Sequence, residues 1–264
     1  MKIRQLAAAT GIVVSGAITL SAPAQAFSFT TNYTQALSGN LASKGDIMLD
    51  SVTLENGKTI NDFTLINSAN ILSNDIYTGS NSGAASADIG DLATTGISLE
   101  ALTDEAGKIV MNNLNLNNII DTEDKGKFVL DLKFEQAVDN ILLWERGQNS
   151  RLDIQALDAN NNVIGNMLHL NSRDWDYAGF DINTKEIGSA QKVGSIGVSM
   201  ADLGLTTQYI SALRVSSNGK SYNGPDFKVL GSVADIPEPS MLLGLGAVVA
   251  GLAARRRKSA EAAA

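Results

Sequence analysis

The segment KFVLDLKF, residues 127–134, alternates in character from one residue to the next. A period of two places alternate side chains on opposite faces of a β-strand, so the pattern predicts a strand with one buried face. The opposite face carries Val129 and two charged residues, Asp131 and Lys133, and should lie nearer solvent. The buried face should carry Phe128, Leu130, Leu132 and Phe134.

The residues that follow predict a β-hairpin. Residues 140–144 form a compact apolar run, and residues 151–157 alternate like the first segment. DANNN, at 158–162, suits a turn because Asp and Asn tolerate positive φ. Residues 163–170 return as a strand, which completes the hairpin.

Short apolar runs separated by turn residues occur along the rest of the chain. Residues 74–91, rich in Ser, Gly, Ala and Asn, predict a long loop with room for a short helix, and Asn56-Gly57 is typical of a hairpin turn. Strands at this spacing favour a mainly β fold, a β-sandwich or jelly-roll, built as one domain over residues 27–233. The further strands are predicted at 46–54, 59–65, 97–102, 109–116, 193–198, 210–215 and 226–230.

The composition excludes several kinds of chemistry. The chain of 264 residues has no cysteine, which excludes disulfides, thiolate metal sites and cysteine nucleophiles. The net charge is −8, with positive charge gathered at the two ends. Because an acidic body repels phosphates, we expect no nucleic-acid partner.

Residues 1–26 have the three parts of a secretory signal peptide. A positively charged start is followed by an uncharged apolar run at 6–20. Ala24 and Ala26 place small residues where signal peptidase requires them, which predicts cleavage between Ala26 and Phe27. The alternative is an uncleaved signal helix that stays in the membrane; the Ala-x-Ala end and the short apolar run favour cleavage.

Residues 234–264 predict a sorting tail. Pro237, Glu238 and Pro239 should be extended and accessible, because proline disfavours helix in the residue before it. Residues 241–254 carry no charge and predict a single transmembrane helix, short of the roughly 20 residues of a full span but extendable by snorkelling arginines. The alternative, a buried core helix, fits poorly with the basic cluster that ends the run. That cluster should stay cytoplasmic and consists of Arg255, Arg256, Arg257 and Lys258.

The order Pro-Glu-Pro, apolar segment and arginine cluster resembles the PEP-CTERM sorting signal. The resemblance covers only the C-terminal tail, and residues 259–264 depart from it by extending past the basic cluster. It implies that a membrane enzyme, exosortase, recognises residues 237–239, cleaves near them and transfers the protein to another anchor. With the signal peptide, it implies an exported protein held at the membrane or the cell surface, with signal peptidase and exosortase as processing partners.

Three stretches of the body carry a second resemblance. They are LLWERGQNS at 142–150, QKVGSIGV at 191–198 and SYNGPDFKV at 221–229. Together they resemble exosortase-dependent surface proteins of cyanobacteria. This resemblance implies extracytoplasmic placement and anchoring, and it implies no reaction.

Two tryptophans are the candidates for ligand contact. Trp144 and Trp175 could stack on sugar rings, with Glu145 and Arg146 beside the first, as in a module that binds carbohydrate or exopolysaccharide. The interpretation we favour places both rings in the core, with Glu145 and Arg146 paired at a strand end.

Several Asp and Asn residues are weak candidates for a calcium site. Asp158, Asn160 and Asn162 alternate like the first ligands of a calcium loop. Gly165 comes late for such a loop, and Leu170 stands where a closing glutamate belongs, so a hairpin turn is the favoured interpretation. Further acidic candidates are Asp174, Asp176, Asp181, Asp88 and Asp91.

The sequence contains little that points to catalysis. His169 is the only histidine, it lies in an alternating segment, and no Gly-x-Ser-x-Gly motif is present. We therefore expect no enzyme activity and no cofactor. The sequence predicts an exported, exosortase-processed, membrane- or surface-anchored protein with a structural or extracellular-matrix role. A carbohydrate-binding module and a secreted hydrolase are the alternatives.

Overall fold

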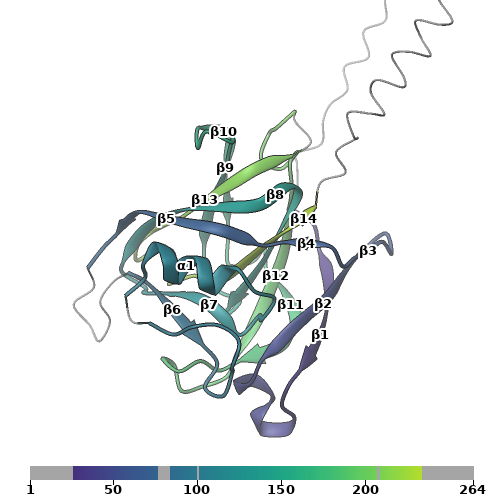
Figure 1. Ribbon diagram of the computed structural model, residues 1–264, viewed down its shortest axis with the longest axis vertical. Coiled ribbons are helices and arrows are strands. Elements are labelled where there is room, and N and C mark those ends of the chain that lie inside the picture. The colour runs from purple at the N-terminus through teal and green to yellow at the C-terminus, as the bar shows by residue number, and fades with distance from the viewer. Residues whose placement is uncertain (1–25, 77–83, 100, 207–208, 234–264) are drawn as a thin grey trace, which may run out of the picture.

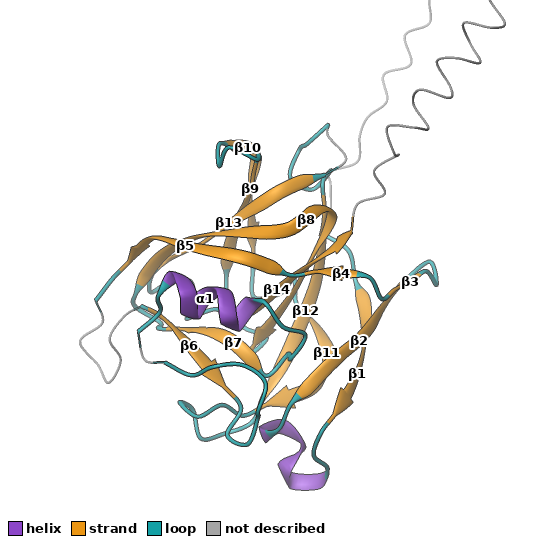
Figure 2. Ribbon diagram, in the orientation of Figure 1, coloured by secondary structure: helices purple, strands orange, loops and turns teal. Residues whose placement is uncertain are grey.

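The computed structural model describes residues 26–76, 84–99, 101–206 and 209–233. Strands dominate this part, and its helices are short: α1 (Asp104–Met111) and the 3-10 helix η1 (Gly39–Lys44) (Figure 2). The strand pairs are antiparallel and form two sheets, one of three strands and one of eleven. The prediction of a mainly β fold is confirmed.

The strands follow one another along the chain in short lengths, apart from β8. They are β1 (Phe29–Gln35), β2 (Ile47–Leu54), β3 (Thr59–Ile60), β4 (Phe63–Thr64), β5 (Ile66–Asn74), β6 (Ala85–Ile89), β7 (Asn118–Thr122), β8 (Lys127–Arg146), β9 (Leu152–Leu157), β10 (Val163–Leu170), β11 (Asp176–Ile182), β12 (Gln191–Ser199), β13 (Ile210–Asn218) and β14 (Asp226–Val233).

Strand β8 joins the two halves of the larger sheet (Figure 1). It runs without a break through residues 127–134 and 140–144, which the sequence predicted as separate strands. Its first half pairs with β5 and β13, and its second half pairs with β12 and β14. A strand that changes neighbours along its length is a common way for packed sheets to turn a corner.

The second half of β8 is buried on both faces. Ile141 and Leu143 belong to one hydrophobic core, together with Phe227 of β14. Leu142 and Trp144 belong to a second core, which the three-stranded sheet of β1, β2 and β3 covers. A layer covered on both sides has no polar face, which explains why the sequence is continuously apolar here and alternates only in the first half of β8.

Two predicted hairpins are confirmed. Strands β9 and β10 pair across the DANNN turn, where Asn161 has a φ of 63°. Strands β2 and β3 pair across the Asn56-Gly57 turn, where Gly57 has a φ of 83°. Positive φ at Asn and Gly is the property for which these residues were expected in the turns.

The prediction of a strand at 109–116 is wrong. Helix α1 and an asparagine-rich loop occupy this stretch, and α1 packs against β5 and β7 (Figure 1). The side chain of Thr103 caps the helix by accepting the N–H of Ala106 at 3.1 Å. In the loop, Oδ1 of Asn115 accepts the N–H of Ile47 at 2.9 Å. The asparagines in this alternating stretch therefore form hydrogen bonds with the backbone of neighbouring segments.

Other strand predictions are wrong in part. The described residues of 97–102 form no strand, and only an isolated bridge joins Leu99 to Ala87. The run 59–65 is divided between β3 and β4, and the predicted loop at 74–91 contains strand β6. Strands β1, β5, β7 and β11 were not predicted, because polar Ser, Thr, Asn and Asp residues interrupt their apolar patterns.

The two ends of the described domain lie close together in the sheet. Phe27 exchanges backbone hydrogen bonds of 2.8 Å with Gly197, whose partner on β8 is Leu142. Near the other end, Ser232 of β14 pairs with Asn140 of β8. The two ends of the described domain therefore both lie beside the middle of β8.

The two predicted targeting segments lie outside the described residues. They comprise residues 1–25, including Ala24, and residues 234–264, which contain Pro237, Glu238, Pro239, the run 241–254 and the cluster Arg255, Arg256, Arg257 and Lys258. Among the helices that are described, none has the length and apolar character needed to cross a membrane.

Candidate functional site

A row of polar side chains crosses four neighbouring strands at one end of the larger sheet. Ser86 of β6 pairs with Asp121 of β7, and Asp226 of β14 pairs with Arg146 of β8. Phe227 pairs with Ile120, which places Asp226 next to Asp121. Residues opposite one another in antiparallel strands share a face, so the pairing brings the two aspartates and the arginine together.

A cavity of about 460 Å³ opens at this end of the sheet. Its wall is strongly acidic, because five aspartate and glutamate residues line it and Arg146 is the one basic residue among them. The strand ends and the loops around them supply the other lining residues: Asp121, Thr122, Glu123, Asp124, Asn149, Glu186, Ile187, Gln191, Asn223, Gly224 and Asp226.

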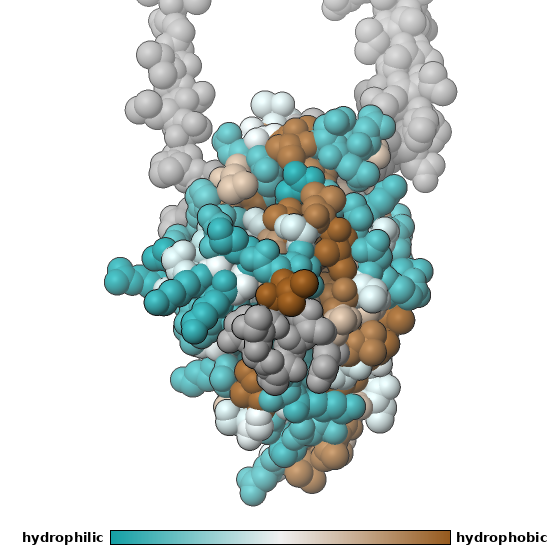
Figure 3. All heavy atoms as spheres, turned by 90° about the vertical axis from the view of Figure 1, so that its left-hand side faces the viewer, coloured by the Kyte–Doolittle hydropathy of each residue, from teal (hydrophilic) through white to brown (hydrophobic). Residues whose placement is uncertain are grey.

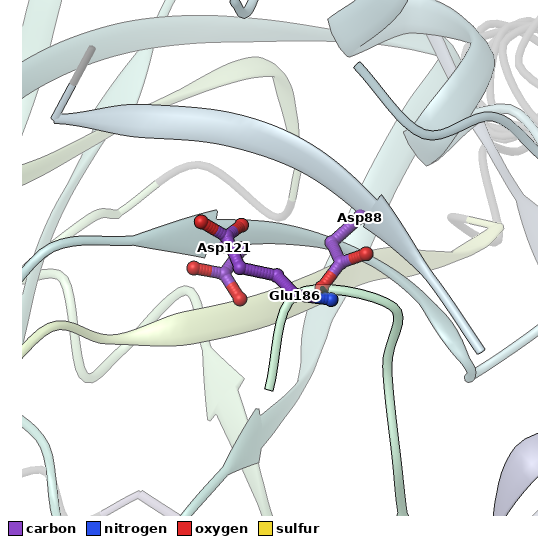
Figure 4. Close-up of side chains that lie close together, drawn as sticks. All are labelled: Asp88, Asp121 and Glu186. Carbon is purple, nitrogen blue, oxygen red and sulfur yellow. Dashed lines mark hydrogen bonds between the residues drawn. The ribbon is translucent and has the colours of Figure 1, made fainter. Parts of the chain in front are cut away.

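Three carboxyl groups converge beside the cavity. Asp88 of β6, Asp121 of β7 and Glu186, from the segment after β11, each bring an oxygen within 4.8 Å of the others (Figure 4). Asp88 and Asp121 are buried, whereas Glu186 is exposed. The backbone N–H of Glu186 donates to Asp88 Oδ2 at 3.3 Å, which ties this segment to the sheet. We call these three residues the carboxyl cluster.

Arg146 lies beneath the cavity with a fully buried side chain. Its Nη1 contacts Asp121 Oδ2 at 3.3 Å and Asp226 Oδ2 at 3.4 Å, and donates to Thr184 Oγ1 at 3.2 Å. Its Nε and Nη2 are buried without a hydrogen-bond partner among the described residues. The guanidinium therefore offsets part of the negative charge of Asp121 and Asp226. It contacts them through only one of its three nitrogens.

The pKa values of the acidic groups reflect burial together with mutual repulsion. Burial, followed by the charge of Asp226, raises the pKa of Asp121 well above its usual range. Burial raises the pKa of Asp226 to about 7, although Arg146 acts in the opposite direction. Burial and the charge of Asp88 raise the pKa of Glu186. The acidic site thus resists carrying its full negative charge.

Glu145 and Arg146 do not form the pair that the sequence predicted. Neighbouring residues of a strand point to opposite faces, so Glu145 points away from the side of Arg146. Its Oε2 accepts the N–H of Asn149 at 3.3 Å, while Oε1 is buried without a hydrogen-bond partner among the described residues. Burial raises the pKa of Glu145 to about 8.

Neither tryptophan offers a ring to a sugar. Trp144 is 1% exposed, and its Nε1 donates to Thr31 Oγ1 at 3.0 Å. Trp175 is 4% exposed, and its Nε1 donates to the carbonyl of Ser150 at 2.9 Å. Both rings pack in the cores, which is where the favoured interpretation expected them. Hydrophobic side chains do reach the surface, as on the face drawn in Figure 3, and Tyr177 and Tyr209 are the aromatic residues among the exposed large hydrophobic ones in the described part.

The calcium candidate in the hairpin is a turn. Asp158 Oδ1 accepts the backbone N–H groups of Asn160 and Asn162 at 2.8 and 2.9 Å, and Oδ2 accepts the side-chain amide of Asn162 at 3.0 Å. These bonds lower the pKa of Asp158. Because the turn itself engages the carboxylate oxygens, these bonds agree with the hairpin turn that the sequence favoured.

The other acidic candidates are separated. Asp174 accepts the N–H of Asn171, Asp176 accepts the hydroxyl of Ser28, and Asp181 accepts the hydroxyl of Tyr177. Asp91 forms an ion pair of 2.9 Å with Lys44. Asp88 alone among these candidates joins the carboxyl cluster.

His169 lies on the exposed side of β10. Its Nδ1 is 2.6 Å from Asp153 Oδ1, and the hydroxyl of Tyr222 donates to Asp153 Oδ2 at 2.6 Å. Burial and the bond to Asp153 raise the pKa of Tyr222 to about 12. The described contacts of the His169 side chain include no serine, so they supply no nucleophile for the hydrolase alternative.

Comparison with known protein families identifies the C-terminal tail. Residues 235–258 match the family model of the PEP-CTERM protein-sorting motif. The chain therefore combines an antiparallel β domain with a C-terminal PEP-CTERM sorting motif, which implies an exported, surface-sorted protein that exosortase processes. No curated protein matches the chain.

Among solved structures, the chain is similar to a histidine mutant of the lectin binding domain of Lectinolysin complexed with Lewis b. The identity is 12% and the TM-score 0.27, over 44% of this chain and 71% of that chain.

The sequence revealed few members of the acidic site. Asp88 and Arg146 were singled out for other reasons, and Asp121 and Glu186 were missed. Arg146 and Asp226 lie in two of the three stretches that carry the second resemblance, and these stretches pair in the sheet as β8, β12 and β14. Strand pairing was the missing information, because no motif spacing links residues 88, 121 and 186.

Proposed function

We propose that the chain is a non-catalytic surface protein of the exosortase-dependent type, with a structural or matrix role. The match of residues 235–258 to the sorting motif is the observation that carries this proposal. The predicted signal peptide supplies the export step, and exosortase cleaves near Pro237–Pro239. The three stretches in β8, β12 and β14 support a relation to the cyanobacterial members of this group.

The geometry of the domain supports an arrangement in which the C-terminal tail holds the domain at the surface. Strand β14 ends at Val233, opposite Val138, and begins at Asp226, opposite Arg146. At about 3.3 Å per residue, Asp226 at the acidic cavity lies about 23 Å from Val233. A domain anchored through its tail would hold this cavity away from the anchor.

Replacing both prolines of the motif, Pro237→Ala and Pro239→Ala, is expected to abolish C-terminal processing in a host that carries exosortase. Alanine no longer restricts the residue before it, so the extended conformation that the prolines are expected to impose would be lost. Intact-mass spectrometry of the membrane and surface fractions measures the mass of the tail removed.

Pro225→Ala is the matched control, because this proline lies in the loop before β14 and outside the motif. Its processing should equal that of the wild type. Unchanged processing of the double variant would rule out recognition through these prolines.

A further inference from the structure

Arg146 leaves two of its hydrogen-bond donors unused. Its Nε and Nη2 are buried and have no acceptor among the described residues, although the guanidinium lies beside Asp121 and Asp226. Leaving a buried donor of a charged group unpaired costs free energy, and native proteins rarely do so. A group other than the described side chains should therefore supply the acceptor.

The two unused nitrogens form one edge of the guanidinium, the edge that binds a pair of oxygen atoms through parallel hydrogen bonds. Arg214 uses the same edge elsewhere in the protein: its Nε and Nη2 donate to the two oxygens of Asp131 at 2.7 and 2.8 Å. In Arg146 the contacts to the aspartates, at 3.3 and 3.4 Å, all come from Nη1. The edge that remains free is suited to a ligand with two adjacent oxygen atoms.

The cavity gives such a ligand a route to Arg146, which is one of its lining residues. Both nitrogens are shielded from solvent, so an entering ligand has to displace a neighbouring side chain. Glu186 can yield, because its side chain is exposed and accepts only a long bond of 3.5 Å from Ser86 Oγ among the contacts described (Figure 4). Its segment stays attached to the sheet through the backbone bond to Asp88.

The charges around Arg146 select a neutral ligand. The acidic residues that line the cavity are Asp121, Glu123, Asp124, Glu186 and Asp226. A bare anion would add to their repulsion, and burial already raises the pKa values of Asp121 and Asp226. A cation would meet the unpaired donors of Arg146. A hydroxyl group suits both kinds of neighbour, because its oxygen accepts a hydrogen bond and its proton is donated in another.

The rest of the lining suits a ligand that carries several hydroxyl groups. Thr122, Asn149, Gln191 and Asn223 add a hydroxyl and three side-chain amides, which both donate and accept. A cavity of about 460 Å³ is within the usual size of a small-molecule site. The lining residues include no aromatic ring, so recognition depends on hydrogen bonds and the affinity should be weak, with a dissociation constant of about 1 mM.

We propose that the acidic cavity binds a neutral sugar, with two vicinal hydroxyl groups held by Nε and Nη2 of Arg146. The same hydroxyl groups donate their protons to the carboxylates of Asp121 and Asp226. The inference rests on the proposed surface role for the source of the sugar, which would be an extracellular polysaccharide. The site itself involves neither the sorting motif nor the tail, so sugar binding and exosortase processing can be measured separately.

Titration of the full chain with neutral sugars tests the site directly. The protein is purified in detergent and titrated with the methyl α-glycosides of glucose, galactose and mannose, which present both cis and trans pairs of vicinal hydroxyl groups. Acetate and glycine are the charged probes. We expect at least one glycoside to show saturable binding by ligand-observed NMR and to raise Tm with increasing concentration. Saturable binding of none of the three glycosides, or of acetate or glycine alone, would overturn the proposal.

The Arg146→Lys variant removes the free edge of the guanidinium and keeps the positive charge beside the two aspartates. It should weaken sugar binding by more than about tenfold, because a lysine ammonium cannot hold two oxygens in parallel. Arg214→Lys is the matched control, since it breaks the same kind of edge at Asp131, outside the cavity. Its sugar binding should stay within about twofold of the wild type. Undiminished binding in folded Arg146→Lys would refute the assignment.

A second variant decides the matter if Arg146→Lys does not fold. Gln191→Trp enlarges a half-buried side chain that lines the cavity at the start of β12, and it should abolish sugar binding by filling the space. Lys192→Trp, on the opposite face of the same strand, is the control and should bind as the wild type does. Full binding in Gln191→Trp would place the sugar elsewhere. Both variants should be processed by exosortase like the wild type, so a loss of sugar binding alone leaves the proposed surface role intact.

Discussion

Glu145→Gln is expected to stabilise the domain at about pH 8 and to flatten its dependence on pH. Burial raises the pKa of Glu145 to about 8, far above its usual value of 4.5. The folded state therefore holds this proton more tightly than the unfolded state does. The resulting stabilisation is complete below about pH 4.5 and is lost as the pH rises toward 8, by up to about 5 kcal/mol.

The amide removes this penalty because it does not ionise. Its oxygen can still accept the N–H of Asn149, as the carboxylate does. Urea unfolding at about pH 5 and about pH 8 measures the free energy of unfolding. The wild type should lose stability between these values, and the variant should lose much less.

Part of the pH dependence should survive in Glu145→Gln. The pKa of Asp226 is raised to about 7, and those of Asp121 and Glu186 are raised as well, all with the same sign. Glu55→Gln, in the exposed turn between β2 and β3, is the control and should leave the slope unchanged. Equal slopes in the wild type and Glu145→Gln would mean that folding does not raise the pKa of Glu145.

Trp144→Ala is expected to cost about 3–5 kcal/mol of unfolding free energy. The ring is buried in the second core, packs edge-on against Phe29 with centroids 5.4 Å apart, and donates to Thr31. Alanine leaves a large cavity between β8 and the three-stranded sheet, and it leaves the Thr31 hydroxyl without this donor. Urea unfolding monitored by circular dichroism measures the loss.

Two comparison variants show whether the loss comes from burial. Trp144→Phe keeps an aromatic ring and should cost less than Trp144→Ala, while Tyr209→Ala removes an exposed ring and should change stability by no more than about 0.5 kcal/mol. If the Trp144→Ala protein were as stable as the wild type, the ring would not lie in the core. Trp144 could then again be considered as a residue that stacks on sugar rings.

The strands that the sequence predicted well are those whose burial leaves a clear pattern. KFVLDLKF alternates because Phe128, Leu130, Leu132 and Phe134 face the core in the structure. Asp131, on the opposite face, is largely buried by its bidentate pair with Arg214. The hairpin after β9 was predictable because its turn depends on local Asn and Asp chemistry.

The failures come from interactions between segments distant in the chain. Asn115 resembled a polar position in an alternating strand, but its amide bonds to Ile47 and to Asp46, nearly seventy residues earlier. The acidic site could not be predicted for a similar reason. Four of its members, at 88, 121, 146 and 226, are brought together by the registers among β6, β7, β14 and β8. The fifth, Glu186, is placed by the hydrogen bond from its backbone N–H to Asp88.

The register between β14 and β8 has a mechanical consequence for an anchored domain. Eight residue pairs join the two strands, from Asp226 opposite Arg146 to Val233 opposite Val138. A force that pulls on the chain beyond Val233, while the acidic end of the domain is held, acts along the strands. The hydrogen-bonded pairs between them are then loaded together in shear instead of being opened one at a time.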